Sequence, residues 1–158
     1  MEHLPVRKNI RLNSNAYRRG NVFFITIATH KRMDWFRRFP LAAEGLQNLI
    51  LKLSKERETT IYAWCIMPNH LHLLLKDHDI SNFVRRLKGH MTSKARKFLM
   101  GQRLWQKSYY DHGLRSDESL QAAARYIWQN PVRKGMVDHP SIYRWSGSIE
   151  WPEWLAME

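Results

Sequence analysis

Two histidines separated by one residue are the first side chains in this sequence whose types and spacing could do chemistry. His70 and His72 stand in an apolar run that ends at Leu75. If that run is a strand, both imidazoles and Leu74 share one face, while the intervening leucines face the other way. Two neutral imidazoles on one face can hold one divalent cation or one phosphate. The alternative is a pair of ordinary, half-exposed histidines, and the spacing alone does not separate the two.

A tyrosine and an asparagine one helical turn apart form a second candidate. Tyr126 and Asn130 are four residues apart, so on a helix they would be neighbours on one face. At about 100° per residue, that face lies roughly a quarter-turn from the apolar stripe of the same helix. In one interpretation, Tyr126 is partly buried and Asn130 only closes the helix. In the other, Tyr126 is a nucleophile and Asn130 is an oxygen ligand to a cation held by the histidines. Such a mixed nitrogen–oxygen set suits Mg²⁺ or Mn²⁺.

The strands that must position the histidines can be predicted from residue type. Runs rich in β-branched and aromatic residues predict buried strands, and the pair Pro68-Asn69 predicts a turn between two of them. The predicted strands are Val22–Thr29, Tyr62–Met67, Leu71–Leu75 and a short one that ends the stretch Trp105–Arg115. Because the run before the turn is strongly apolar, we expect this hairpin to be central in its sheet.

Apolar residues at helical spacing predict three helices. The first begins at Pro40 and runs to about Arg57, the second is capped by Asp79, and the third is capped by Ser116 and stopped by Pro131. The second helix is basic, and we expect it to give the histidines a cationic neighbourhood. The apolar stripes of the first two helices are Leu41, Leu46, Leu49, Ile50 and Leu53, and Ile80, Phe83, Val84, Leu87, Met91, Ala95 and Phe98.

The order strand, helix, strand, strand, helix, strand, helix predicts the fold class. Its first six elements match the α+β, ferredoxin-like βαββαβ pattern, an antiparallel sheet with helices on one face. The last helix is additional, and it or a ligand can cover the other face. The length of 158 residues and the hydrophobic content of 44% support one core. We therefore predict a basic N-terminal arm at 1–20, one domain at 21–150 and a C-terminal tail at 151–158.

The net charge is the strongest compositional signal. The sequence has 26 lysine and arginine residues against 14 aspartate and glutamate residues, which gives a net charge of +12. Such a field attracts polyanions, and aromatic residues interleaved with basic ones suit single-stranded nucleic acid. An anionic membrane is a weaker alternative because the charge is spread along the chain. The single Cys65 and the lack of an apolar run of ~20 residues predict a soluble, cytoplasmic protein without an internal disulfide.

Four motifs, taken in order, resemble one family of DNA-processing enzymes. The family is the REP-associated tyrosine transposases, relatives of the single-strand transposases in the HUH (His-hydrophobe-His) class. The motifs that resemble it are MPNHLHLLL, YYDHGLR, YIWQNPVRKGMV and YRWSGS, and the resemblance runs from about Tyr17 to Ser148. A His-x-His pair alone is a weak signal, whereas the ordered set at these separations is strong.

The resemblance implies a site and a reaction. In such enzymes the histidines, here His70 and His72, bind a metal ion, and a helix tyrosine cleaves single-stranded DNA by forming a 5′-phosphotyrosine. That tyrosine maps to Tyr126, and the third ligand maps to Asn130. Many relatives carry glutamine at the third-ligand position, and the asparagine matches the REP-associated branch. The family also implies recognition of a short tetranucleotide beside a DNA hairpin.

The residues and the resemblance together predict a metal-dependent endonuclease and strand transferase. Its expected substrate is single-stranded DNA with a REP-like hairpin, its expected cofactor is Mg²⁺ or Mn²⁺, and its expected location is the cytoplasm, at the nucleoid. A monomer is favoured over a homodimer. The predicted DNA-binding residues are Arg18, Arg19, Arg85, Arg86, Lys88, His112 and Arg115.

Other roles stay open in the sequence. A non-catalytic ferredoxin-like nucleic-acid-binding module would explain the charge and the fold, with the histidines incidental. A metal hydrolase of small phosphoesters would use the histidines but not Tyr126. Tyr109 and Tyr110 are rival nucleophiles, although they are expected to precede a strand and lack an oxygen-bearing partner four residues later. His112 could bind phosphate, transfer a proton or be structural, and the basic arm could be a solvated terminus.

Overall fold

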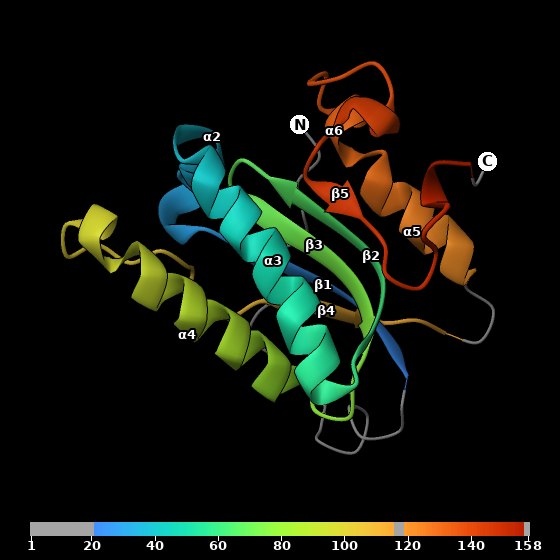
Figure 1. The fold of residues 1–158 in the computed structure, drawn as a ribbon, viewed down its shortest axis with the longest axis horizontal. Coiled ribbons are helices and arrows are strands. Elements are labelled where there is room, and N and C mark those ends of the chain that lie inside the picture. Colours follow the sequence, from blue (N-terminus) through green and yellow to red (C-terminus); the bar gives the residue numbers. More distant parts are fainter. Residues whose placement is uncertain (1–20, 116–118, 157–158) are drawn as a thin grey trace.

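A five-stranded antiparallel sheet carries the histidine pair in the part of the chain that the computed structural model describes, residues 21–115 and 119–156 (Figure 1). The strands are β1 (Val22–Ala28), β2 (Thr60–Met67), β3 (His70–Lys76), β4 (Tyr110–Gly113) and β5 (Ser146–Gly147). They lie in the order β4-β1-β3-β2-β5. The hairpin with the histidines is therefore central, as the sequence predicts.

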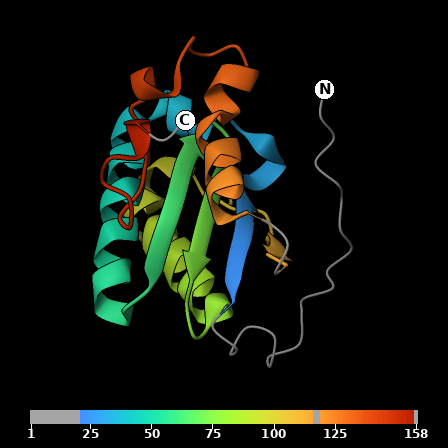
Figure 2. The ribbon, with the colours of Figure 1, turned by 90° about the vertical axis from the view of Figure 1, so that its right-hand side faces the viewer.

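Helices cover both faces of this sheet. The α-helices are α2 (Trp35–Arg38), α3 (Pro40–Arg57), α4 (Ile80–Leu99), α5 (Leu120–Trp128) and α6 (Asn130–Arg133). Short 3₁₀ turns lie at η1 (His30–Arg32), η2 (Pro140–Ile142) and η3 (Trp154–Ala156). The long helices α3 and α4 pack on one face, and α5 packs on β2 and β3 from the other (Figures 1 and 2). The predicted α+β, ferredoxin-like fold with an additional C-terminal helix is confirmed.

The fifth strand was not predicted because it is too short to show a pattern. Ser146 and Gly147 pair with Cys65 and Trp64 of β2. A Cβ atom on Gly147 would lie 2.3 Å from the Trp64 ring, so this pairing requires glycine. The strand widens the sheet by one edge strand, next to β2.

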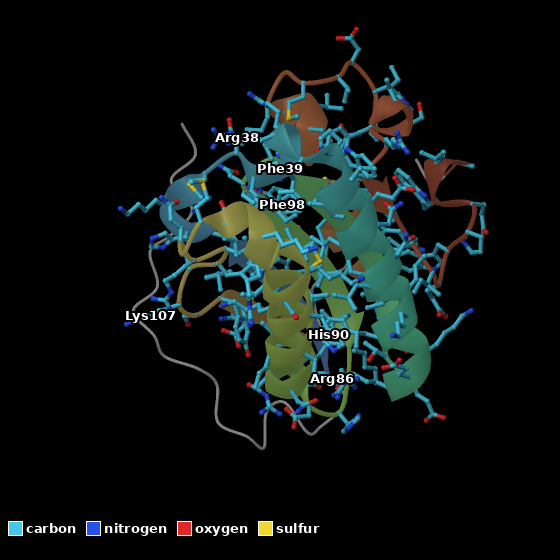
Figure 3. The ribbon with its side chains drawn as sticks, turned by 60° about the vertical axis from the view of Figure 1, so that its left-hand side comes forward. Arg38, Phe39, Arg86, His90, Phe98 and Lys107 are labelled. Carbon is cyan, nitrogen blue, oxygen red and sulfur yellow. The ribbon has the colours of Figure 1, made fainter. Side chains whose placement is uncertain are left out.

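The apolar stripes of α3 and α4 face the sheet, with two exceptions. Leu41 is 82% exposed and Phe98 is 57% exposed, so their prediction as core residues was wrong. Leu41 is one residue out of phase with the stripe, and Ala42 takes its place against the core. Leu99 is buried in place of Phe98, whose ring packs on Phe39, 5.6 Å between centroids (Figure 3).

The core consists of two clusters, one on each face of the sheet. The larger one lies under α3 and α4 and contains the leucines that alternate with the histidines in β3. The smaller one lies under α5 and contains Cys65, Leu74, Ala124 and Ile127. Cys65 is the only cysteine of the chain and is fully buried there. Burial raises the pKa of its thiol to about 12.

The start of α5 differs from the prediction. The helix begins at Leu120, and the side chain of its N-cap, Ser119, accepts a hydrogen bond from the backbone N–H of Ala122 at 3.1 Å. The prediction of Ser116 as the cap was therefore wrong. Ser119 is followed by the helical apolar stripe just as Ser116 is, so the local signal could not separate them. Pro131 does not end the helix directly, because α5 ends at Trp128 and Pro131 lies inside α6.

The ends of the chain differ in what the structure describes. The predicted basic arm at 1–20, with Arg18 and Arg19, lies outside the described residues. The C-terminal segment packs through Trp154, whose ring lies 4.8 Å from that of Trp128. No helix among the described residues is long and apolar enough to cross a membrane.

A buried ion pair fixes α3 relative to α4. Arg57 donates from Nη2 to Oδ1 of Asp77 at 2.7 Å and from Nε to Oδ2 at 3.1 Å, and the Asp77 side chain is 0% exposed. The carboxylate also accepts from the Thr59 hydroxyl and from the backbone N–H of Asp79, the N-cap of α4. Burial raises the pKa of the Asp77 carboxyl, but the bonds from Arg57 and Thr59 outweigh it and hold the pKa below its usual value.

Asp77→Asn should lower the free energy of unfolding by about 3–5 kcal/mol, because it leaves a buried guanidinium without its charged partner. Because its pKa is lower in the folded protein, the ionised Asp77 carboxylate stabilises the fold fully above the pKa of the unfolded state, ~3.9. This stabilisation is lost as the pH falls through the pKa of the folded state. The difference from wild type should therefore shrink below about pH 4 in urea unfolding experiments. Glu56→Gln, which breaks only the exposed pairs with Lys52 and Arg86, should cost less than about 1 kcal/mol. Equal losses in the two variants would contradict this assignment.

Candidate metal and nucleophile site

The histidine pair lies in the middle of the sheet, on the face that α5 covers. His70 and His72 are 5% and 3% exposed, and their Nε2 atoms are 3.2 Å apart. Leu74 of the same face packs under α5, whereas the alternating leucines pack on the other side. The predicted sharing of one face is confirmed. The alternative of two half-exposed histidines is wrong, because both rings are buried on the face of the sheet against which α5 packs.

Hydrogen bonds at the other ring nitrogens orient both imidazoles. His70 donates from Nδ1 to Oδ1 of Asn69 at 2.7 Å. Nδ1 of His72 lies 2.9 Å from Oγ1 of Thr26, which is directly opposite in β1, and can donate to it. With the protons on Nδ1, each Nε2 atom keeps its lone pair, which is the form in which a histidine can bind a metal ion, and the two Nε2 atoms lie 3.2 Å apart. Sequence spacing did not single out Asn69 or Thr26, because their role depends on the turn and on the strand register.

The side chain of Asn130 completes the cluster. Its amide nitrogen lies 3.2 Å from Nε2 of His70, and the residue is 4% exposed. Rotation of the amide by half a turn presents its oxygen at the same place, since the two ends of this group have nearly the same shape. In the described part of the chain, no third histidine, cysteine or carboxylate joins the pair. Among the described residues, Asn130 is thus the side chain that lies beside Nε2 of His70 together with His72.

Asn130 and Tyr126 do not share one surface as the helical spacing predicts. Asn130 is buried, whereas Tyr126 is 43% exposed. The reason is that α5 ends at Trp128, and Asn130 is the first residue of α6. The break directs the amide inward and leaves the phenol near the surface.

Burial and nearby cations keep both imidazoles neutral. Burial, together with Arg32 and Lys134, lowers the pKa of His70 to about 3. Burial lowers the pKa of His72 well below its usual value, and His70 and Arg133 add to this effect. The neutral form is the one that binds a metal ion.

The cations around the histidines are not those of the predicted basic helix. They are Arg32 at the end of η1 and Arg133 and Lys134 beyond α5, whereas α4 covers the opposite face of the sheet (Figure 2). The prediction that positive charge surrounds the histidines is confirmed, but the prediction that α4 supplies this charge was wrong. The motif YIWQNPVRKGMV contained the signal, since Arg133 and Lys134 lie one and two residues after its NPV.

Tyr126 lies one aromatic ring away from the histidines. Phe24 of β1 packs on His72 at 5.3 Å between ring centroids and on Tyr126 at 6.0 Å. The guanidinium of Arg133 lies over the Tyr126 ring, 3.8 Å from its centroid, and donates to the Tyr126 backbone oxygen at 2.8 Å. Arg133 therefore places a positive charge directly against the Tyr126 side chain.

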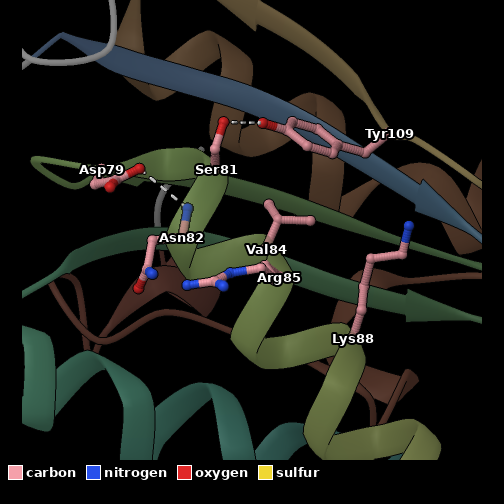
Figure 4. A pocket seen from close by; sticks show the side chains of 7 residues that line it. All are labelled: Asp79, Ser81, Asn82, Val84, Arg85, Lys88 and Tyr109. Carbon is pink, nitrogen blue, oxygen red and sulfur yellow. Dashed lines mark hydrogen bonds between the residues drawn. The ribbon is translucent and has the colours of Figure 1, made fainter. Parts of the chain in front are cut away.

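The rival tyrosines lie on opposite faces of the sheet. Tyr110 is the first residue of β4, so the prediction that it precedes the strand was wrong. It pairs with Thr26 and therefore faces the same side as His72, separated from it by β1. The hydroxyl of Tyr109 lies 3.1 Å from Oγ of Ser81 at the start of α4 (Figure 4). Tyr109 is thus directed away from the histidines.

The remaining predicted DNA-binding residues divide between the two faces. His112 pairs with Phe24 and so shares the histidine face, and Arg115 follows the end of β4. On the other face, exposed Arg85 lines a cavity of about 460 Å³ beside the first turns of α4 (Figure 4). The ammonium of Lys88 donates hydrogen bonds to the backbone oxygens of Gln106 and Ser108, and Arg86 forms an ion pair with Glu56.

The chain belongs to the IS200-like transposase family, whose model matches residues 22–130. The match runs from the start of β1 to Asn130 and therefore includes every element that carries the site. A REP-associated tyrosine transposase of Escherichia coli (strain K12) is 25% identical over 134 residues, which cover 82% of this chain and 78% of that relative. The resemblance predicted from the four motifs is confirmed.

A solved structure supports the fold independently. The structure of a REP-associated tyrosine transposase bound to a REP hairpin superposes with a TM-score of 0.70 at 23% identity. The superposition covers 89% of this chain and 82% of that one. At this identity the similarity shows the fold alone.

Proposed function

We propose that this protein is a metal-dependent endonuclease and strand transferase that cleaves single-stranded DNA beside hairpins through a 5′-phosphotyrosine. The observation that carries the proposal is the cluster of His70, His72 and Asn130, at 3.2 Å separations, beside the exposed Tyr126. The name of the solved relative, which is bound to a REP hairpin, supports hairpin DNA as the substrate. The net charge of +12 suits a polyanionic substrate.

The side chains present fit a divalent metal ion. Two adjacent ligands of an octahedral ion with bonds of ~2.1 Å are ~3 Å apart, which agrees with the 3.2 Å between the histidine Nε2 atoms. Asn130 would add an oxygen ligand, and this nitrogen–oxygen set suits Mg²⁺ or Mn²⁺. When bound, the ion would stabilise negative charge on the scissile phosphate. Asn69 and Thr26 hold the two imidazoles in the orientation that this role needs.

Tyr126 would act as the nucleophile. Its hydroxyl oxygen would form a bond to phosphorus while the bond from phosphorus to the 3′-oxygen breaks, which leaves a 5′-phosphotyrosine and a free 3′-hydroxyl. The proton that leaves the phenol balances the proton taken up by the leaving oxygen. Arg133, which lies over the ring, would hold the Tyr126 side chain in place through a cation–π contact.

The test is incubation with labelled, hairpin-bearing single-stranded DNA and Mn²⁺, followed by a denaturing gel. We expect a labelled band at the mass of the protein plus the DNA fragment, and we expect a chelator to abolish it. Salt-sensitive binding without any adduct would instead identify a non-catalytic nucleic-acid-binding module. Cleavage without an adduct would identify a hydrolase that does not use Tyr126.

Replacing Arg85, Arg86 and Lys88 with alanine should weaken DNA binding and flatten its salt dependence. The slope should change by roughly 0.7 for each phosphate of a single strand that the protein no longer neutralises. Because Arg86 and Lys88 have partners within the protein, we expect Arg85→Ala alone to account for most of the change. An unchanged slope would mean that this helix face is only solvated. The matched control removes three exposed cations from the other end of α4, Lys94, Arg96 and Lys97.

A further inference from the structure

A second cavity, of about 230 Å³, lies on the side of α5 that faces β5. It is lined by Arg125 and Trp128 of α5, by Gln129, the C-cap of that helix, and by His139, Pro140 and Trp154. The cavity has no part in the proposed metal site. Its walls come from three segments that are distant in the sequence: α5, the start of η2, and η3.

Two tryptophans give this cavity a firm aromatic wall. The rings of Trp128 and Trp154 are 4.8 Å apart with an angle of 33° between their planes. Trp128 is 3% exposed, and its Nε1 donates to the backbone oxygen of Gly147 at 3.0 Å, which fixes the ring. Trp154 is half-buried. An aromatic wall of this kind stacks on nucleobases of any sequence, because every base has a π-face.

The polar groups of the cavity suit a nucleotide. Arg125 is half-buried, and Gln129 and His139 are exposed. All three line the cavity and can be reached by a ligand from solvent. An amide such as that of Gln129 can donate and accept hydrogen bonds at the edge of a base. An arginine can bind the adjacent phosphate. None of the residues that line the cavity is acidic.

The cavity and Tyr126 lie on opposite flanks of one helix. The Tyr126 ring packs on Phe24 of β1, whereas Trp128 is bonded to Gly147 of β5. At about 100° per residue, positions 125 and 129 lie on the outer side of α5, between these two flanks. A strand joined to Tyr126 could therefore cross the outer side of α5, past Arg125 and Gln129, and reach the cavity.

We propose that this cavity binds one nucleobase of the single-stranded DNA substrate, at a nucleotide close to the phosphate that Tyr126 attacks. The base stacks against Trp154, and Gln129 contacts its edge, so the cavity contributes to the choice of cleavage sequence. The proposal rests on the proposed function for the identity of the substrate.

The test selects sequences by binding alone. Wild type and the variants Trp154→Ala and Gln129→Ala are each incubated with DNA hairpins whose single-stranded flanks are randomised, and the bound DNA is sequenced. Wild type should prefer particular bases, and both variants should lose the preference at one and the same position. Affinity of Trp154→Ala for the preferred sequence should fall by about 5- to 150-fold, the scale of one stacked base. An abasic nucleotide at that position should weaken binding by wild type but not weaken binding by Trp154→Ala further.

Trp151→Ala is the matched control. Trp151 belongs to the same aromatic cluster, 6.2 Å from Trp128, but does not line the cavity. It should keep the base preference at every position. Thermal melting checks that each variant is folded. If Trp154→Ala unfolds, Gln129→Ala is used alone, because Gln129 is exposed and its replacement should leave the fold intact. A uniform loss at all positions, no loss, or the same loss in Trp151→Ala would overturn the proposal.

The outcome separates this proposal from the proposed function. The selection measures binding and needs no cleavage. A loss of base preference at one position, without any covalent adduct, would therefore support the nucleobase site and refute the proposed endonuclease activity. An adduct without any base position that depends on Trp154 or Gln129 would refute the cavity and leave the endonuclease standing.

Discussion

Tyr126→Phe should fold and bind hairpin-bearing DNA as wild type does, yet form no covalent adduct. Phenylalanine keeps the ring that packs on Phe24 and lies under Arg133, and it removes only the oxygen that would attack phosphorus. Removal of the nucleophile of a covalent mechanism costs roughly 10⁴-fold or more in rate. The measurement is transfer of label to the protein on a denaturing gel, with DNA affinity measured in parallel by filter binding or fluorescence anisotropy.

The rival tyrosines provide the controls. Tyr109→Phe should retain adduct formation, because its hydroxyl lies near Ser81 on the opposite face. Tyr110→Phe is the sharper control, because Tyr110 shares the face of the histidines. If labelled DNA still became attached to Tyr126→Phe and no longer to Tyr110→Phe, the nucleophile would be Tyr110.

His70→Ala or His72→Ala should abolish cleavage and leave most of the DNA affinity intact. Cleavage depends on a metal ion held by both rings, whereas affinity comes mainly from lysine and arginine contacts to phosphates. Binding of Mn²⁺, measured by the loss of the free-ion signal in electron paramagnetic resonance, should weaken in parallel. Because the pKa of His70 is about 3 and that of His72 is lowered too, protons should not compete with the metal between about pH 5 and 8.

The control for charge and residue type is His90→Ala. His90 is an exposed histidine of α4, on the other side of the sheet (Figure 3). It should leave both cleavage and Mn²⁺ binding unchanged. Unchanged Mn²⁺-dependent cleavage in the double variant of His70 and His72 would refute the metal site.

Features that depend on a short repeat could be predicted from the sequence. The alternation in β3 placed His70 and His72 on one face, and the helical stripes placed α3 and α4, because period two and period 3.6 are fixed by backbone geometry. Errors arose where neighbouring residues fit the same period, as with Phe98 and Leu99. The period alone does not decide between them, because positions 98 and 99 lie three and four residues after the buried Ala95, and both spacings fall on one face of a helix.

Interactions between distant segments could not be predicted in this way. The hydrogen bond between His72 and Thr26 depends on the register of β1 against β3, and the position of Arg133 over Tyr126 depends on the break after Trp128. The charge pattern did not predict the structural role of Lys88 either. Its ammonium holds the loop before β4 by donating to two backbone oxygens. A cation that supports a loop and a cation that meets solvent have the same sequence signature.

The burial of the chain's one thiol makes the docking of α5 measurable. Cys65 lies in the cluster where Ala124 and Ile127 of α5 rest on the sheet, and it is fully buried. A chromogenic disulfide reagent can reach its sulfur only when that packing opens, so the rate of modification reports how often the helix lifts. The unaltered protein thus contains its own reporter group for the motion of the segment that bears Tyr126. Comparing the rate with and without DNA would show whether substrate clamps that segment or frees it.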